Sequence, residues 1–384
     1  MLNKHYFDLH VQLKPDLVIL AGEVSLYIKD NGRIEFIDFA YTDEYLSVDR
    51  IEPLTPAGPP LLNTTQRYMS DGRSLPGFID DLLPDDWGKR VIASQFNSKV
   101  ADKLLVLNQC HKGCGIGAYR LSPKGLKPNW SHGTKLDNSS IDRYSENLID
   151  LNIDHDIIES SSLVGGAQPK GLIQINGKPY LLKLNAAVSS SYNSAILEHA
   201  ALETIRSSGL RAPNSQVISF KHETYSLQGI LIERFDIKPN GCFKPMVSIN
   251  SLLKSTYTQE DPANGSYEDI ARCIRDYSCH PVEDLKQLFF QLLLNEAIGN
   301  TDDHLRNFAM IKEDSGWQLS PAYDVVPQEH LQAEHAISFN KSFILPRLEL
   351  ASDTAKKLGL TLGEEVNSIQ QTIQRIDTHI NSCQ

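Results

Sequence analysis

The stretch that decides the fold of this chain is GNTDDHLRNFAMIKEDSGWQLSPAYD, residues 299–324. It follows a long apolar segment and contains two short apolar runs on either side of Asp-Ser-Gly at 314–316. Acidic residues and glycine between two apolar runs are typical of a β-hairpin turn. Because a hairpin brings its two ends together, we expect Asn307 and Asp324 to lie close in space.

The same stretch carries residues suited to phosphoryl transfer. Asp302 stands five positions before Asn307, which is the D-x-x-x-x-N spacing of a protein-kinase catalytic loop. Phosphoryl transfer needs a carboxylate to accept the proton of the attacking hydroxyl, and oxygen ligands for Mg²⁺. We predict Asp302 as the base, Asn307 and Asp324 as metal ligands, and His304 as a phosphate contact. An isolated spacing of this kind is common by chance, so the prediction depends on the hairpin and on Asp324.

Three segments upstream supply further parts of a nucleotide site. Val-Gly-Gly-Ala-Gln-Pro-Lys at 164–170 offers backbone N–H groups to phosphate, although by itself it reads equally well as a tight turn. Lys183 lies within an apolar strand, where an unpaired charge is costly. A phosphate with Glu198 as counter-ion explains it; an edge-strand lysine that points to water is the alternative. Residues 232–236 end the β-rich half, where a kinase hinge contacts adenine.

Periodicity along the chain indicates an α+β protein with a β-rich N-terminal part and an all-helical C-terminal lobe. At 384 residues the chain exceeds the roughly 250–300 residues of a single core. Strand alternation, hairpin turns and helical spacing predict strands, helices and one linker. We expect strands around a turn at 30–32 and at 118–121, 172–175, 180–184, 216–220 and 229–233, helices after 84 and at 194–208, 282–298 and 364–380, and a linker at 123–143. The expected domains are 1–125, 140–240 (N-lobe) and 241–384 (C-lobe).

Composition narrows the classes of function. The formal net charge of −11 argues against a chain that grips nucleic acid by itself, because phosphate contacts need clustered lysine and arginine. No apolar run approaches the roughly 18–20 residues of a membrane helix, and the N-terminus lacks a secretory signal. We therefore expect a cytoplasmic protein with reduced thiols. The Cys110–Cys114 and Cys273–Cys279 groups do not have the spacing of zinc sites.

Several strings, in this order, resemble the HipA family of kinase toxins from toxin–antitoxin modules. The most specific are GNTDDHLRNFAMI at 299–311 and LSPAYDVVP at 319–327. VGGAQPK, YLLKLN at 180–185 and LIERFD at 231–236 precede them in register. The N-terminal strings LPGFIDDLLPDDWGKRVIA at 75–93 and GIGAYRLSP at 115–123 look like the family's N-terminal subdomain. The resemblance covers nearly the whole chain.

The resemblance implies a bilobed kinase-like fold that binds ATP and Mg²⁺, with Asp302 as catalytic base. Nucleotide or metal contacts are implied for Gly165, Gly166, Ala167, Gln168, Pro169, Lys170, Lys183, Glu233, Arg234, Phe235, His304, Asn307, Tyr323 and Asp324. It also implies a protein substrate, such as an aminoacyl-tRNA synthetase or another translation component. A helix-turn-helix antitoxin (HipB-like) is the implied partner and the route to DNA. Family members autophosphorylate a serine before the glycine loop, and Ser162 is the candidate here; a solvated serine run is the alternative.

We therefore predict a HipA-like serine/threonine kinase toxin. Two alternatives stay open at this point. One is a kinase-fold phosphotransferase that acts on a small molecule, and the other is a degenerate kinase that serves as a transcriptional co-repressor. The presence of all four residues Lys183, Asp302, Asn307 and Asp324 favours an enzyme, because a binding module has no need of them together.

Overall fold

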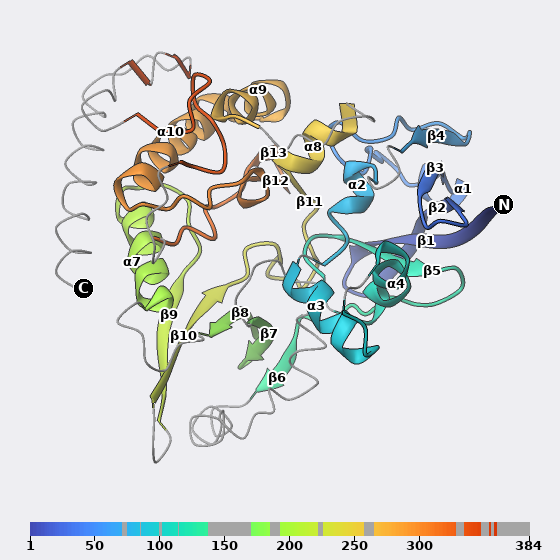
Figure 1. Cartoon of the computed structure of the whole chain (residues 1–384), viewed down its shortest axis with the longest axis horizontal. Helices are drawn as coiled ribbons and strands as arrows, with labels where there is room; N and C mark the ends of the chain where they lie inside the picture. Colours follow the sequence, from blue (N-terminus) through green and yellow to red (C-terminus); the bar gives the residue numbers. More distant parts are fainter. Residues whose placement is uncertain are drawn as a thin grey trace. The chain divides into compact units, whose positions relative to one another are not determined.

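A computed structural model of the chain defines its strands and helices (Figure 1). It describes residues 1–70, 75–84, 86–99, 102–113, 115–136, 170–184, 193–221, 226–256, 265–327, 334–346, 353–354 and 357–358. The chain divides into two compact units. The first comprises Met1–Leu182, Asp236–Val247 and Ser251–Pro262, and the second comprises Lys183–Phe235, Ser248–Asn250 and Ala263–Gln384.

The first unit begins with an antiparallel five-stranded sheet of order β4-β3-β2-β1-β5. Its strands are β1 (Leu2–Lys14), β2 (Leu17–Lys29), β3 (Ile34–Tyr41), β4 (Gln66–Met69) and β5 (Tyr119–Pro123). The turn predicted at 30–32 is confirmed: it joins β2 to β3, and Gly32 adopts a φ of 79° there. Positive φ is the region that glycine enters without a steric penalty, which fits its place in this turn.

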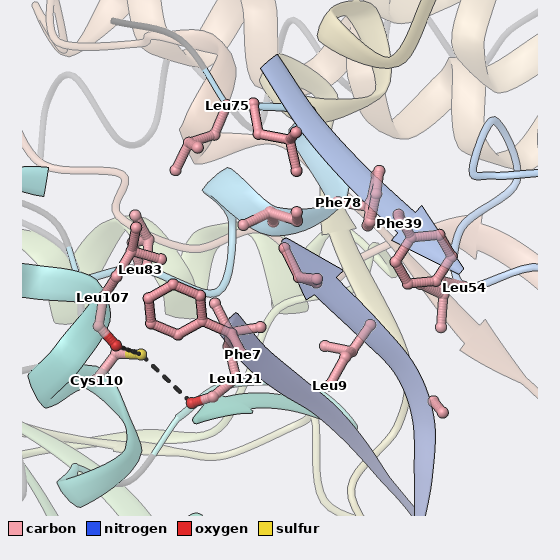
Figure 2. Close-up of a cluster of buried hydrophobic side chains, with 14 of the residues drawn as sticks. Phe7, Leu9, Phe39, Leu54, Leu75, Phe78, Leu83, Leu107, Cys110 and Leu121 are labelled. Atoms are coloured by element: carbon pink, nitrogen blue, oxygen red, sulfur yellow. Dashed lines mark hydrogen bonds between the residues drawn. The ribbon is translucent and has the colours of Figure 1, made fainter. Parts of the chain in front are cut away.

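One face of this sheet carries the main hydrophobic core (Figure 2). Phe7 and Leu9 on β1 and Phe39 on β3 are buried in it, and the spacing of Phe7 and Leu9 is the period of two along a strand. Cys110 lies at the edge of the cluster, and the carbonyl oxygens of Leu107 and Leu121, 3.2 and 3.3 Å from its Sγ, share its one thiol proton. This cysteine therefore behaves as a buried core side chain, and burial raises the pKa of its thiol to about 12.

Short helices accompany this sheet. They are α1 (Asp43–Leu46), α2 (Gly77–Asp80), α3 (Asp86–Gln95), α4 (Lys103–Gln109) and the 3₁₀ turn η1 (Cys110–Lys112). The helix predicted after Pro84 is confirmed as α3. A Cβ on Gly77 would lie 2.0 Å from the carbonyl oxygen of Ser251, so only glycine allows α2 this close approach.

A second sheet has the order β6-β7-β8-β10-β9. Its strands are β6 (Thr134–Leu136), β7 (Lys170–Ile175), β8 (Lys178–Leu184), β9 (Ser215–Lys221) and β10 (Ser226–Glu233). The predicted Asn-Gly hairpin is confirmed, since Asn176 and Gly177 both have positive φ between β7 and β8. The linker predicted at 123–143 is wrong in part: β6 lies within it and pairs in parallel with β7. Three residues are too few to show an alternating pattern.

The second unit holds the longest helices. α7 (Ser194–Ser207) and α10 (Pro281–Ala297) confirm the helices predicted at 194–208 and 282–298, and α9 (Tyr267–Tyr277) packs beside α10 (Figure 1). The predicted hairpin is confirmed as β12 (Ala309–Glu313) and β13 (Gly316–Leu319). The three-residue strand β11 (Met246–Ser248) pairs with β12 and completes a three-stranded sheet, and α8 (Ile249–Thr256) follows β11 directly in the chain. The helix predicted at 364–380 lies outside the described residues. Within the parts of the chain that the structure describes, no helix is long and apolar enough to span a membrane.

Candidate active site

The candidate catalytic loop connects α10 to β12. The chain leaves α10 at Gly299, whose φ of 67° is the left-handed conformation that commonly ends a helix. It then passes Asp302 and forms a 3₁₀ turn, η2 (Leu305–Asn307). Within this loop, Nδ2 of Asn307 donates to the backbone carbonyl of Asp302 over 2.8 Å. That bond leaves the amide oxygen of Asn307 for another partner, as a metal ligand requires.

The β12–β13 hairpin returns the chain toward this loop. Met310 pairs with Leu319, and the amide of Ser320 donates to the carbonyl of Ala309 over 2.8 Å. Beyond the hairpin, the hydroxyl of Tyr323 donates to the carbonyl of Arg306 over 2.7 Å. This bond joins the residues adjacent to Asp324 and Asn307. The hairpin therefore brings the two ends of the predicted site together.

Lys183 lies at the centre of a charged cluster in the second unit. Its Nζ lies 2.6 Å from Oε1 of Glu198 on α7 and 2.7 Å from Oδ1 of Asp324. The Lys183 side chain is 7% exposed and that of Glu198 is 1% exposed. Burial by itself lowers the pKa of a lysine, but the charges of Asp324 and Glu198 outweigh it and hold the pKa of Lys183 above its usual range. The cluster is therefore a fixed cation between two carboxylates.

Asp324 adopts an unusual backbone conformation. Its φ is 57°, in the left-handed region that costs about 1–2 kcal/mol for a residue with a side chain. Aspartate is among the few residue types that enter this region with some frequency. Strained residues of this kind persist when their surroundings fix them and often occur at functional sites. Here the bond to Lys183 fixes the carboxylate.

Asp302 differs from Asp324 in its surroundings. Its side chain is 65% exposed, and its Oδ1 lies 4.0 Å from Nε2 of His304. Partial burial of the carboxyl in the loop raises the pKa of Asp302 above its usual range; a protonated His304 acts against that shift, and the charges of Asp324 and Asp303 add to it. Nδ1 of His304 is buried and finds no hydrogen-bond partner among the described residues. An accessible carboxylate with a raised pKa suits a general base.

The predicted hinge, residues 233–235, begins at the last residue of β10. Glu233 and Asn214 exchange two bonds of 2.8 Å, one from the Glu233 amide to the Asn214 carbonyl and one from Nδ2 of Asn214 to Oε2 of Glu233. The ring of Phe235 lies 5.9 Å from that of Tyr323, centroid to centroid. Arg234 is buried. The structure thus links the hinge segment to the residue before Asp324 through two aromatic rings.

Other predicted residues cannot be placed with this group. Gly165, Gly166, Ala167, Gln168, Pro169 and Ser162 lie outside the described residues. Lys170 is the first residue of β7, is buried and belongs to the first unit. Among the described residues, no cluster of three or more histidine, cysteine, aspartate or glutamate side chains has the geometry of a metal site.

A buried network behind the loop was not predicted from the sequence. The hydroxyl of Tyr267 donates to Oδ2 of Asp303 over 2.6 Å, and Nδ2 of Asn295 donates to the Tyr267 hydroxyl over 3.0 Å. Asp303 is adjacent to Asp302 and was visible in the motif. Tyr267 and Asp303 are 36 positions apart, and no local pattern in the sequence relates them.

These elements and this site define a kinase-like α+β protein. The model of the HipA-like C-terminal domain matches residues 162–382, and that of the HipA N-terminal domain matches residues 18–121. The chain belongs to the HipA family. The first match contains every predicted site residue.

Solved structures and curated relatives agree with this assignment. The HipA chain of a Shewanella oneidensis complex of HipA, HipB and operator DNA superposes with a TM-score of 0.65 at 18% identity, covering 98% of this chain and 91% of that one. At this identity the comparison shows a shared fold. A Haemophilus influenzae protein named as a candidate kinase is 28% identical over 138 residues, which cover 34% of this chain and 40% of that protein. A similarly named Sinorhizobium fredii protein, Y4mE, is 30% identical over 61 residues, which cover 16% of this chain and 14% of that protein.

Proposed function

We propose that this protein is an ATP- and Mg²⁺-dependent serine/threonine protein kinase and the toxin of a toxin–antitoxin pair. The observation that carries the kinase proposal is the buried lysine that bridges Glu198 and Asp324. A lysine on a strand paired with a glutamate on the following helix is the arrangement with which protein kinases hold nucleotide phosphates. In this chain the same lysine also contacts a candidate metal ligand, which supports a single site for the three groups.

Each charged or polar group of the candidate site would have its own role in phosphoryl transfer. Asp302, accessible and with a raised pKa, accepts the proton of the attacking hydroxyl. When nucleotide binds, Lys183 exchanges its contact with Asp324 for a contact with the phosphates. Asn307 and Asp324 would hold Mg²⁺, since both offer the oxygen ligands that this ion prefers. Bound Mg²⁺ would neutralise charge on the transferred phosphoryl group.

Nucleotide contacts complete the proposal. Backbone groups of Glu233, Arg234 and Phe235 would meet adenine, and the Tyr323 ring beside Phe235 offers an aromatic face. His304, whose Nδ1 lacks a partner within the described part of the chain, would meet phosphate. The loop 165–170 would cover the phosphates with its backbone N–H groups. Ser162, just before it, is the proposed site of autophosphorylation.

The partners follow from the family and from charge. The Shewanella HipA is found with HipB on operator DNA. We propose a HipB-like, helix-turn-helix antitoxin for this protein as well, because a net charge of −11 disfavours direct DNA contact and a basic partner would supply it. The acceptor would be a serine or threonine of a protein, such as an aminoacyl-tRNA synthetase.

Transfer from [γ-³²P]ATP tests the proposal. Wild-type protein with Mg²⁺ should label itself or a protein in a cell lysate, and Asp302→Asn should lower the rate by about 10²-fold or more. Asp314 is an exposed aspartate in the turn of the β12–β13 hairpin, and Asp314→Asn is the matched control that should keep wild-type activity. A wild-type protein that binds ATP but transfers no phosphate would favour the co-repressor alternative. Labelling of a small molecule only would favour the phosphotransferase alternative.

The toxin role needs a separate experiment. Expression of wild type should slow growth, Asp302→Asn should not, and co-expression of an adjacent helix-turn-helix gene product should restore growth. Normal growth with the wild-type protein would contradict the toxin role and leave the phosphoryl transfer standing.

A further inference from the structure

A directional chain of buried hydrogen bonds leaves the candidate catalytic loop and returns to it. Nδ2 of Asn300 donates to Oδ1 of Asn295 over 3.0 Å, and Nδ2 of Asn295 donates to the hydroxyl of Tyr267 over 3.0 Å. That hydroxyl donates to Oδ2 of Asp303 over 2.6 Å. The first and last members belong to the loop, while Asn295 lies on α10 and Tyr267 on α9. The chain therefore ties the loop to two helices.

Every member of this hydrogen-bond chain is buried, from Asn300 to Asp303. A buried carboxylate is costly unless its oxygens accept hydrogen bonds, so the donors around Asp303 fix the position of its side chain. Its Oδ1 accepts from the amide of Ala336 over 3.0 Å, and its Oδ2 also lies 3.1 Å from Nδ1 of His335. These partners on both carboxylate oxygens hold the Asp303 side chain in one orientation.

The two neighbouring aspartates face opposite surroundings. The side chain of Asp303 is 0% exposed, whereas that of Asp302 is 65% exposed. They are adjacent in the chain, so any movement of the Asp303 backbone also moves Asp302. Anchoring Asp303 inward therefore restricts the direction in which Asp302 can point outward. The charge of Asp303 also contributes to the raised pKa of Asp302.

We propose that Asp303 and Tyr267 are positioning residues that hold the catalytic loop and aim Asp302 at the acceptor hydroxyl. The inference rests on the proposed kinase function for its catalytic consequence. It predicts a larger effect on the rate of transfer than on nucleotide binding, because Lys183, Glu198 and Asp324 are not members, whereas Asp302 lies in the loop that the chain holds. Displacement of a catalytic group by about 1 Å can cost on the order of 10²-fold in rate.

Tyr267→Phe tests this proposal, because it removes one hydroxyl and keeps the ring. Tyr277→Phe, at the other end of the same helix, is the matched control. We expect Tyr267→Phe to lower kcat by about tenfold to a hundredfold, with a much smaller change in KM for ATP and in the Kd for a non-hydrolysable ATP analogue. A Tyr267→Phe protein with wild-type kcat, or with KM raised by as large a factor as kcat is lowered, would overturn the proposal.

A second measurement does not depend on activity. Hydrogen–deuterium exchange should be faster in residues 299–307 of Tyr267→Phe, with exchange at the centre of α10 unchanged. If Tyr267→Phe fails to fold, Asn300→Ala, which removes the first donor of the hydrogen-bond chain, should have the same effect. Unchanged exchange in a folded variant would refute the anchoring even if the wild-type protein proved to be no kinase. Wild-type protein without transfer activity, but with faster loop exchange in the variant, would refute the proposed function and retain the anchoring.

Discussion

Lys183 and Asp324 are 141 positions apart in the sequence, yet Nζ of the lysine lies 2.7 Å from Oδ1 of the aspartate. Glu198 contacts the same ammonium from α7. The Lys183 ammonium thus pairs with two carboxylates, and of the two only Glu198 is fully buried. Asp324, with a side chain 33% exposed, is therefore the more accessible partner of the cation.

Removal of Lys183 should destabilise the fold through Glu198. Lys183→Met removes the cation that lies 2.6 Å from the buried Glu198 carboxylate, and we expect a loss of about 3–5 kcal/mol in the free energy of unfolding. The double variant Lys183→Met/Glu198→Leu should recover most of that loss, because it also removes the buried carboxylate. Urea denaturation of both variants measures the difference. A double variant as unstable as the single one would show that packing, and not the buried charge, sets the cost.

The pH dependence of transfer should report on Asp302. A general base acts when deprotonated, so activity falls as pH drops through the pKa of Asp302, which lies above the ordinary 3.8. Protonated His304 lowers that pKa; His304→Asn removes the positive charge and should raise it further. The acidic limb of the kcat–pH profile should therefore move to higher pH. His280→Asn, an exposed histidine at the start of α10, should leave the limb in place, and a shift toward lower pH in His304→Asn would contradict the assignment.

The sequence predicts those parts of the structure that have a local or periodic signal. The helix α10 follows from the spacing of its leucines, and the β12–β13 hairpin from its turn residues. The spacing of Asp302 and Asn307 pointed to the loop. No local signal relates Tyr267 to Asp303 or Lys183 to Asp324, because such contacts depend on how separate elements pack.

The backbone of Asp324 offers a test that separates strain from charge. Asp324→Gly and Asp324→Ala both remove the carboxylate, so neither should transfer phosphate. They differ at a φ of 57°, where alanine is strained and glycine is not. We expect the glycine variant to be more stable than the alanine variant by about 1 kcal/mol, measured by urea denaturation. Equal stability would mean that the chain relaxes out of the left-handed conformation once the bond to Lys183 is lost.

A second buried carboxylate, Asp284, anchors the end of the hairpin. Its side chain is 0% exposed and accepts from Nη2 of Arg211, from the hydroxyl of Ser278 over 2.6 Å and from the amide of Leu319 over 2.7 Å. Leu319 ends β13 and leads toward Asp324. Asp284 therefore connects the first turn of α10 to the segment that carries the candidate metal ligand.

Asp284→Ala should remove the carboxylate partner of Arg211, which keeps its bond to the carbonyl of Leu319, and leave the buried Leu319 amide without its acceptor. We expect a loss of about 3–5 kcal/mol in the free energy of unfolding, as for other broken buried ion pairs. Asp269→Ala removes an acidic side chain from the capping box of α9 and serves as the control, with an expected loss of about 1 kcal/mol. Thermal denaturation of the two variants gives the ranking. If Asp284→Ala were no less stable than Asp269→Ala, the Arg211–Asp284 pair would not hold the hairpin, and the position of Asp324 would have to depend on Lys183 instead.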